Sequence, residues 1–211
     1  MNIVLTSVEP ALTAAWERHC RDLPDVTIHD GSILDLTVDA VVSPANSFRF
    51  MDGGLDYAYS AHFGWDVQDR LQELIHTRHH GELLVGTAEV VDTGDVRIPF
   101  VIAAPTMRVP MILVDSVNPY LAARAVLLLI RHGTVASGPL AGHPVREVVQ
   151  SVAVPGLGTG VGRVDPDTCA RQVRTAIEEV VLGRGGFPRT WAEAQQHHQL
   201  LYSNIVRDLQ R

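Results

Sequence analysis

A short apolar run that passes into a proline and then a glycine pair constrains the fold most strongly. Asp39-Ala40-Val41-Val42 is typical of a buried strand, and Pro44 ends its hydrogen-bond ladder. Asn46 therefore follows the strand's carboxyl end, where open α/β sheets bind their ligands. Gly53-Gly54 lets the main chain approach a ligand closely. We expect an amide, a carboxylate and accessible backbone to meet at this edge.

A second glycine-rich loop, residues 155–163, separates an apolar run from a predicted helix. Its four alternating glycines free backbone N–H groups to converge on an anion, and the helix N-terminus adds partial positive charge. The loop is therefore predicted to hold a phosphate or diphosphate. It is neither a Walker loop nor a Rossmann fingerprint, because it lacks the Lys-Ser/Thr pair and the required glycine spacing. Taken alone, such a turn is purely structural about half the time.

Apolar runs with strand character alternate with amphipathic helical stretches. This order predicts a three-layer α/β/α sandwich around a central mixed, mostly parallel sheet. Strands are expected at residues 2–8, 26–29, 40–43, 84–91, 100–104 and 148–154. Helices are expected at residues 11–21, 55–63, 65–80, 119–132 and 166–182.

Three helix boundaries have clear local chemistry. Asp165-Pro166 and Asn118-Pro119 each pair an N-cap with a proline, and Gly133 is a C-terminal stop. Residues 184–188 then interrupt the chain before a terminal helix at 189–209, which we expect Trp191 and residues 200–202 to pack onto the body. The predicted organisation is one α/β domain at 1–183 and a helical extension at 184–211 on the same domain. A linker to a separate partner-binding helix is the alternative.

Composition limits the class of protein. The 211 residues are 46% hydrophobic and 19% charged, as in a globular chain, and suffice for one domain with a sizeable core. A formal charge of −7 argues against a general nucleic-acid or anionic-membrane surface. Cys20 and Cys169 are expected to be free thiols in a reducing compartment. No apolar run reaches the roughly 18 residues of a membrane span, so we expect a cytoplasmic protein.

The first loop resembles the ligand loop of macrodomains, the ADP-ribose-binding family. That family follows a strand with Asn-Ala-Ala-Asn, a few small or apolar residues, a glycine run and Val-Asp. Ser43-Pro44-Ala45-Asn46, Met51-Asp52-Gly53-Gly54 and Leu55-Asp56 occupy these places without a gap, although the first Asn and two glycines are missing. Gly158-Thr159-Gly160-Val161 resembles the family's second loop, which cradles the diphosphate. Gly162 replaces the aromatic residue of many hydrolytic members.

The resemblance also implies how a ligand would lie. Asp30-Gly31-Ser32-Ile33 resembles the family's Gly-Asp-Ile, whose Asp bonds the adenine amine, but Ser32 replaces that Asp. Adenine is then expected near Ser32-Ile33, the diphosphate over the second loop, and the distal ribose beside the first. The implied ligand-binding residues are Ser32, Ile33, Asn46, Gly53, Gly54, Leu55, Gly158, Thr159, Gly160, Val161 and Gly162.

Two of these loop side chains are candidates for chemistry. The resemblance implies that the Asn46 amide fixes the distal ribose through both a donated and an accepted hydrogen bond. It also implies that Asp56 orients or deprotonates a water or a ribose hydroxyl near the scissile bond. Spacing alone leaves bland alternatives: Asn46 as an Asx-type turn residue and Asp56 as a helix N-cap. Asp52 is the rival carboxylate. Arg108, past another strand's end, would clamp a phosphate or the modified partner, or simply be exposed.

The implied activity is metal-free hydrolysis of an ADP-ribosyl linkage, either an ester on a modified acidic side chain or the 1″-phosphate of free ADP-ribose. The alternative is a non-catalytic reader of ADP-ribose or a related nucleotide, which Ser32, Gly162 and the missing first Asn favour. The expected partner is ADP-ribose or an ADP-ribosylated macromolecule, without a cofactor. His76, His79 and His80 are more typical of a solvated helix end than of a metal site.

Overall fold

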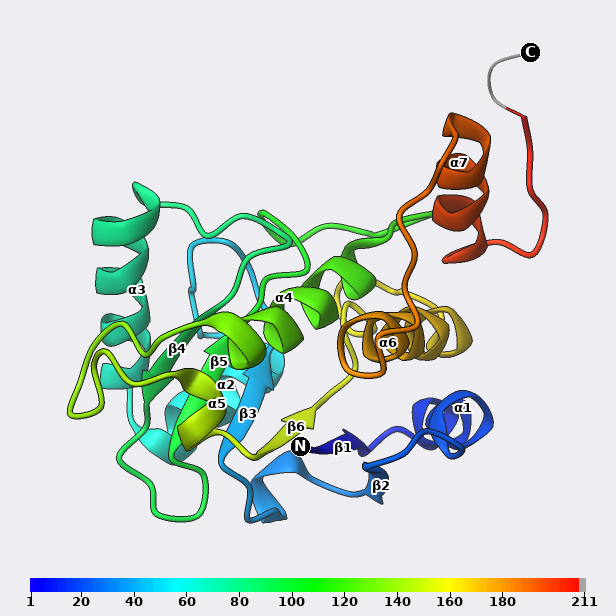
Figure 1. The fold of residues 1–211 in the computed structure, drawn as a ribbon. Coiled ribbons are helices and arrows are strands. Elements are labelled where there is room, and N and C mark those ends of the chain that lie inside the picture. The colour runs from blue at the N-terminus through cyan, green and yellow to red at the C-terminus, as the bar shows by residue number, and fades with distance from the viewer. Residues whose placement is uncertain (209–211) are drawn as a thin grey trace.

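Six strands form one sheet in the order β2-β1-β6-β3-β5-β4 in the computed structural model, which describes residues 1–208 (Figure 1). All neighbouring strands are parallel except β4, which runs antiparallel to β5 at the edge. The predicted mixed, mostly parallel sheet is therefore confirmed. The strands are β1 (Asn2–Ser7), β2 (Val26–Asp30), β3 (Ala40–Ser43), β4 (Glu89–Asp92), β5 (Phe100–Ala103) and β6 (Ser151–Val154).

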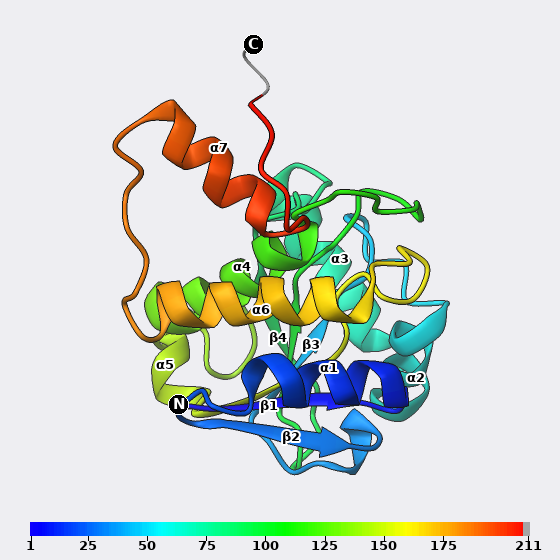
Figure 2. The same cartoon turned by 90° about the vertical axis from the view of Figure 1, so that its right-hand side faces the viewer.

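Helices cover both faces of this sheet, which confirms the three-layer sandwich (Figures 1 and 2). Successive strand residues point to opposite faces. Ala40 and Val42 pack in the core under α1, α4 and α6, whereas Val41 packs in the core under α2 and α3. The helices are α1 (Pro10–Cys20), α2 (Gly54–Phe63), α3 (Asp66–His79), α4 (Asn118–His132), α5 (Val145–Val148), α6 (Pro166–Val180) and α7 (Trp191–Leu200), with a 3-10 turn η1 (Ile33–Asp35).

One carboxylate joins the beginnings of two neighbouring strands, β3 and β6. Asp39 Oδ2 accepts hydrogen bonds from Gln150 N at 2.9 Å and from Ser151 N and Oγ, each at 2.8 Å. In return, Asp39 N donates to Ser151 Oγ at 2.9 Å. Because both strands start from this shared network, their carboxyl ends emerge side by side at the opposite edge of the sheet.

Several predicted boundaries shift. Asp165 caps α6 as expected, and Gly133 ends α4. Asn118 is not a side-chain cap, because α4 already begins there and its amide donates instead to Thr106 O at 2.7 Å. The predicted strand at 84–91 is wrong in its first half, where Gly86, at φ +93°, forms a turn. The strand predicted at 148–154 begins only at Ser151, because a short helix, α5, precedes it.

The terminal helix is shorter than predicted. It spans Trp191–Leu200 rather than 189–209, and residue 209 lies outside the described part of the chain. In both views α7 lies on the outer side of α4 and α6 and is not part of the three layers (Figures 1 and 2). His197 Nε2 lies 3.1 Å from Glu179 Oε1, and Leu201 is buried. Trp191 was expected to pack inward, but it is 62% exposed. No helix within residues 1–208 is long and apolar enough to cross a membrane.

Candidate functional site

A cleft of about 270 Å³ opens at the carboxyl edge of the sheet, over three adjacent strands. The loops that follow β3, β5 and β6 form it, together with the N-terminus of α2. Figure 2 shows these loops together on the side toward which the arrows of β1 and β2 point. The residues that line the cleft are Pro44, Ala45, Asn46, Phe50, Asp52, Gly53, Gly54, Leu55, Asp56, Thr106, Met107, Pro110, Gly156, Gly158, Gly160, Val161 and Gly162.

Backbone hydrogen bonds tie the three loops together. Ser47 N in the first loop donates to Met107 O and Arg108 O, both at 3.1 Å, and Leu113 N donates to Gly162 O at 2.8 Å. The loop after β5 thus joins the two glycine loops. The sequence pointed to this loop through Arg108, but the residues that line the cleft are Thr106, Met107 and Pro110, which carry no chemical motif.

The glycines of the second loop have different roles. Gly158 adopts φ +72°, and a Cβ on Gly162 would lie 2.5 Å from the Gly158 carbonyl oxygen, so both positions need glycine to form the loop. A Cβ on Gly160 would meet nothing within 4 Å. Gly160 therefore lines the cleft without being required by the fold, and a side chain there has room to enter the ligand space.

The N-terminus of α2 supplies backbone donors on the other side of the cleft. Gly53 is the N-cap, and no side chain caps this helix. Gly54 and Leu55 begin the first turn, where N–H groups have no partner within the helix, and both line the cleft. These donors and the positive end of the helix dipole make this wall suitable for an anionic or hydroxyl-rich ligand.

Asp56 belongs to a buried charged cluster. Its Oδ1 accepts a hydrogen bond from Ser43 Oγ and lies 3.5 Å from Arg49 Nη2, which also bonds Ser43 Oγ. The side chains of Arg49 and Asp56 are 0% and 4% exposed. Asp56 is the third residue of α2, so the N-cap alternative is wrong. In the described chain both of its contacts use Oδ1, which leaves Oδ2 with its full acceptor capacity.

Arg49 is the residue of this cluster that sequence reasoning missed. Its backbone adopts φ +58°, which is uncommon outside glycine, and its Nη1 donates to Ser43 O at 3.3 Å. Its Nε is buried without a hydrogen-bond partner among residues 1–208.

Beside the cluster, burial raises the pKa of Tyr59 well above its usual value, and the charge of Asp56 adds to the shift. Tyr59 therefore stays neutral and donates to Val42 O at 3.0 Å.

The Asn46 side chain makes the local hydrogen bonds of an Asx-type turn residue, the structural alternative to a ligand contact. Its Oδ1 accepts from Phe48 N at 3.1 Å and Phe50 N at 3.3 Å, and its Nδ2 donates to Phe50 O at 3.0 Å. Both acceptor positions of Oδ1 are thus occupied, while one N–H of Nδ2 remains for another partner. In this conformation Asn46 is able to donate to a ligand but not to accept from it.

Three of the expected ligand-binding residues do not line the cleft. Ser32 Oγ accepts from Leu34 N at 3.2 Å and caps η1, after the edge strand β2. Ile33 is 4% exposed and belongs to the core under α2 and α3. Thr159 sits in the second loop between cleft-lining glycines but is not part of the wall. Arg108 forms a two-pronged ion pair with Glu82 at 2.7 and 3.2 Å and does not line the cleft.

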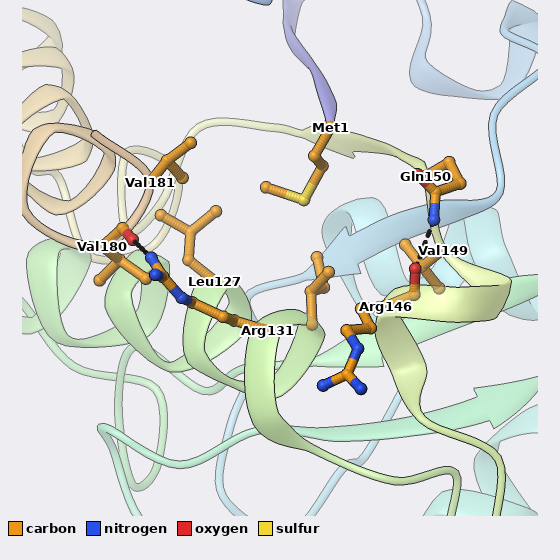
Figure 3. A pocket seen from close by; sticks show the side chains of 9 residues that line it. Met1, Leu127, Arg131, Arg146, Val149, Gln150, Val180 and Val181 are labelled. Carbon is orange, nitrogen blue, oxygen red and sulfur yellow. Dashed lines mark hydrogen bonds between the residues drawn. The ribbon is translucent and has the colours of Figure 1, made fainter. Parts of the chain in front are cut away.

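A second hollow, of about 210 Å³, lies at the opposite edge of the sheet, where β1 and β6 begin (Figure 3). Its walls are mainly aliphatic, and Arg131 uses its guanidinium to donate to Val180 O. The lining is Met1, Leu127, Ile130, Arg131, Arg146, Val149, Gln150, Val180 and Val181. No carboxylate lines this hollow, whereas Asp52 and Asp56 both line the first cleft. Within the described residues, no group of three His, Cys, Asp or Glu side chains is placed to hold a metal ion.

Comparison with known proteins identifies the family. The model of the macro domain matches residues 42–173, a stretch that contains both glycine loops. The chain belongs to the macro domain family. An uncharacterized protein of Aquifex aeolicus is 30% identical over 156 residues, which cover 74% of this chain and 81% of that protein. An uncharacterized protein of Aeropyrum pernix is 30% identical over 159 residues, which cover 75% and 72%.

Solved macrodomains share the fold. The macrodomain of Mycobacterium tuberculosis DarG superposes with a TM-score of 0.58 at 21% identity, over 72% of this chain and 90% of that one. The Oceanobacillus iheyensis macrodomain with ADP gives 0.55 at 21% identity, over 70% and 71%. Thermosipho africanus DarTG in complex with ADP-ribose gives 0.53 at 15% identity, over 75% and 39%. At these identities the likeness establishes the α/β/α fold.

Proposed function

We propose that this macrodomain binds ADP-ribose in the cleft and hydrolyses an ADP-ribosyl linkage, either an ester on a modified protein or the 1″-phosphate of ADP-ribose. The observation that carries the proposal is the convergence of both glycine loops, Asn46 and Asp56 on one cleft in a chain of this family. The diphosphate lies over the second loop, and the distal ribose lies between Asn46 and the N-terminus of α2. The solved relative in complex with ADP-ribose supports the choice of ligand.

Asp56 is our first choice for the catalytic carboxylate, and Asp52 is the rival. Arg49 and Ser43 hold Asp56 in a fixed position, and its Oδ2 is able to orient or deprotonate a water or a ribose hydroxyl in the cleft. Asp52 also lines the cleft, but it is exposed on the loop. No step of this mechanism needs a metal.

A non-catalytic reader of ADP-ribose or a related nucleotide is the second candidate. Two observations favour it: the Asp56 carboxylate is already paired with a buried guanidinium, and both acceptor positions of Asn46 are used by the backbone. Both contacts would hold a ligand-binding loop rigid without any chemistry. A reader binds ADP-ribose and releases it unchanged.

Calorimetry with ADP-ribose, ADP and AMP tests the binding proposal. The second loop and the α2 N-terminus contact the diphosphate and the distal ribose, so ADP-ribose should bind at least tenfold more tightly than AMP. Equal affinities for these two ligands would contradict the arrangement. A ligand that binds the native state also raises the melting temperature, so thermal unfolding with each nucleotide gives an independent measurement of binding.

Hydrolysis of ADP-ribose 1″-phosphate and of an ADP-ribosylated acidic peptide separates the enzyme from the reader. Asp56→Asn keeps an acceptor for Ser43 and removes the carboxylate, so it should lower turnover by 10²–10⁴-fold while ADP-ribose affinity changes little. Asp52→Asn is the matched control. If only Asp52→Asn lowers turnover, the assignment of Asp56 is wrong. Wild-type protein that binds ADP-ribose but hydrolyses neither substrate is a reader.

A further inference from the structure

All three loops that form the cleft carry exposed apolar side chains. Their exposed fractions range from 46% for Val109 to 74% for Val114. We define the apolar rim as Phe50, Val109, Met111, Ile112, Val114 and Val161. Phe50 and Val161 also line the cleft itself, so the rim continues the cleft wall outward. Exposed apolar side chains that gather on neighbouring loops mark an interaction site more often than scattered single residues do.

The rim is held in place by the fold. Leu113, at the centre of the loop after β5, is only 6% exposed, and its N–H donates to Gly162 O at 2.8 Å. Its side chain fills the space beside Gly158 and Gly162, where an added Cβ would lie 3.0 Å from it. Leu113 is thus buried against the second glycine loop, while its neighbours Met111, Ile112 and Val114 are exposed. The loop thus presents these side chains on a fixed base.

Charges near the rim argue against a nucleic-acid partner. Arg108, next to Val109, is already paired with Glu82 and lies 5.1 Å over the ring of Phe48. The other charged residues within two positions of a rim residue in sequence are Arg49, which is buried against Asp56, one exposed cation, Arg163, and two carboxylates, Asp52 and Asp115. A phosphate backbone is bound chiefly by clustered Lys and Arg side chains, and this surface has no such cluster in the described chain.

We propose that the apolar rim binds the polypeptide that carries the ADP-ribosyl group, through apolar side chains next to the modified residue. This inference rests on the proposed function. A group attached to the distal ribose leaves the cleft past Phe50 and Val161 and meets the loop that carries Met111 and Ile112. The macrodomain therefore prefers modified proteins whose acceptor residue has apolar neighbours.

Two synthetic peptides with one ADP-ribosyl group on a hydrolysis-resistant linkage test the proposal. One peptide has leucines beside the modified residue, and the other has aspartates. Calorimetry should show that the leucine peptide binds about tenfold more tightly than free ADP-ribose, whereas the aspartate peptide binds no more tightly. Ile112→Asp and Met111→Asp should abolish this gain and leave the affinity for free ADP-ribose within about twofold, because neither side chain lines the cleft.

Val96→Asp is the matched control. Val96 is 94% exposed on the turn between β4 and β5, which lies where β5 begins, whereas the cleft lies where β5 ends. It should leave the peptide preference intact. Equal binding of both peptides, or an unchanged preference in Ile112→Asp, overturns the proposal. So does tighter binding of an ADP-ribosylated oligonucleotide, or a wild-type dimer that Ile112→Asp dissociates. Failure of wild type to bind free ADP-ribose would instead refute the proposed function.

Discussion

Replacement of Asp56 by alanine should destabilise the protein far more than the loss of a surface carboxylate. The substitution leaves the guanidinium of Arg49 fully buried without its ion-pair partner. Removing one member of a buried pair typically costs about 3–5 kcal/mol, whereas loss of a helix N-cap costs about 1 kcal/mol. With a urea slope of about 2 kcal/mol per M, the unfolding midpoint of Asp56→Ala should fall by about 2 M.

The double variant Arg49→Met/Asp56→Ala is the critical comparison. It removes both charges, so it should be more stable than Asp56→Ala alone, and the two substitutions should be strongly non-additive. Asp56→Asn, which still accepts from Ser43, should fall between wild type and Asp56→Ala. Equilibrium urea unfolding followed by circular dichroism measures these four proteins together with Arg49→Met, the second single variant that the test of additivity requires. A loss of only about 1 kcal/mol in Asp56→Ala, with additive effects in the double variant, would falsify the buried-pair argument.

Three further predictions follow from the structure. Gly160→Val should keep the melting temperature and weaken ADP-ribose binding at least tenfold by calorimetry, because its Cβ meets only open space at the cleft wall. Burial raises the pKa of Cys20 and Cys169 to about 12, so both thiols should resist a thiol reagent at pH 8 until denaturant is added. A hydrogen bond from Arg18 lowers the pKa of Asp167 from 3.8. The ionised Asp167 carboxylate therefore stabilises the folded state above that pH, and this contribution is lost as the pH falls through the lowered pKa. Asp167→Asn should make the free energy of unfolding depend less on pH below about pH 4, as measured by acid unfolding.

Local sequence patterns were sufficient where a segment's neighbours in the chain decide its structure. Val41-Val42 followed by Pro44 predicted β3 and its end, and Asp165-Pro166 predicted the start of α6. The alternating glycines of the second loop likewise predicted a turn between β6 and α6. These signals depend on apolar periodicity, fixed proline geometry and side-chain capping, all of which act over a few residues.

The charged cluster was not predictable by the same means. In the sequence Arg49 is a basic residue in a loop, where exposure is the ordinary expectation. Its burial depends on Asp56 in α2 and on Ser43 at the end of β3, which tertiary packing brings together. The exposure of Trp191 is the opposite case. An aromatic residue suggested a packed helix end, but α7 contacts the body through His197 and the Leu200 carbonyl, and the residues after the helix add Leu201 and Asn204.

The strand order has a consequence for how the protein is made. β6, the last strand in the chain, is inserted at the centre of the sheet between β1 and β3. The hydrogen bonds of Asp39 that join β3 to β6 form only after Ser151, 112 residues later, has been synthesised. A nascent chain that ends before β6 therefore holds two unjoined groups of strands with unpaired edges, which are prone to misassociation. The walls of the cleft are therefore complete only after the ribosome has synthesised this central strand and the glycine loop that follows it, long after the loops of β3 and β5.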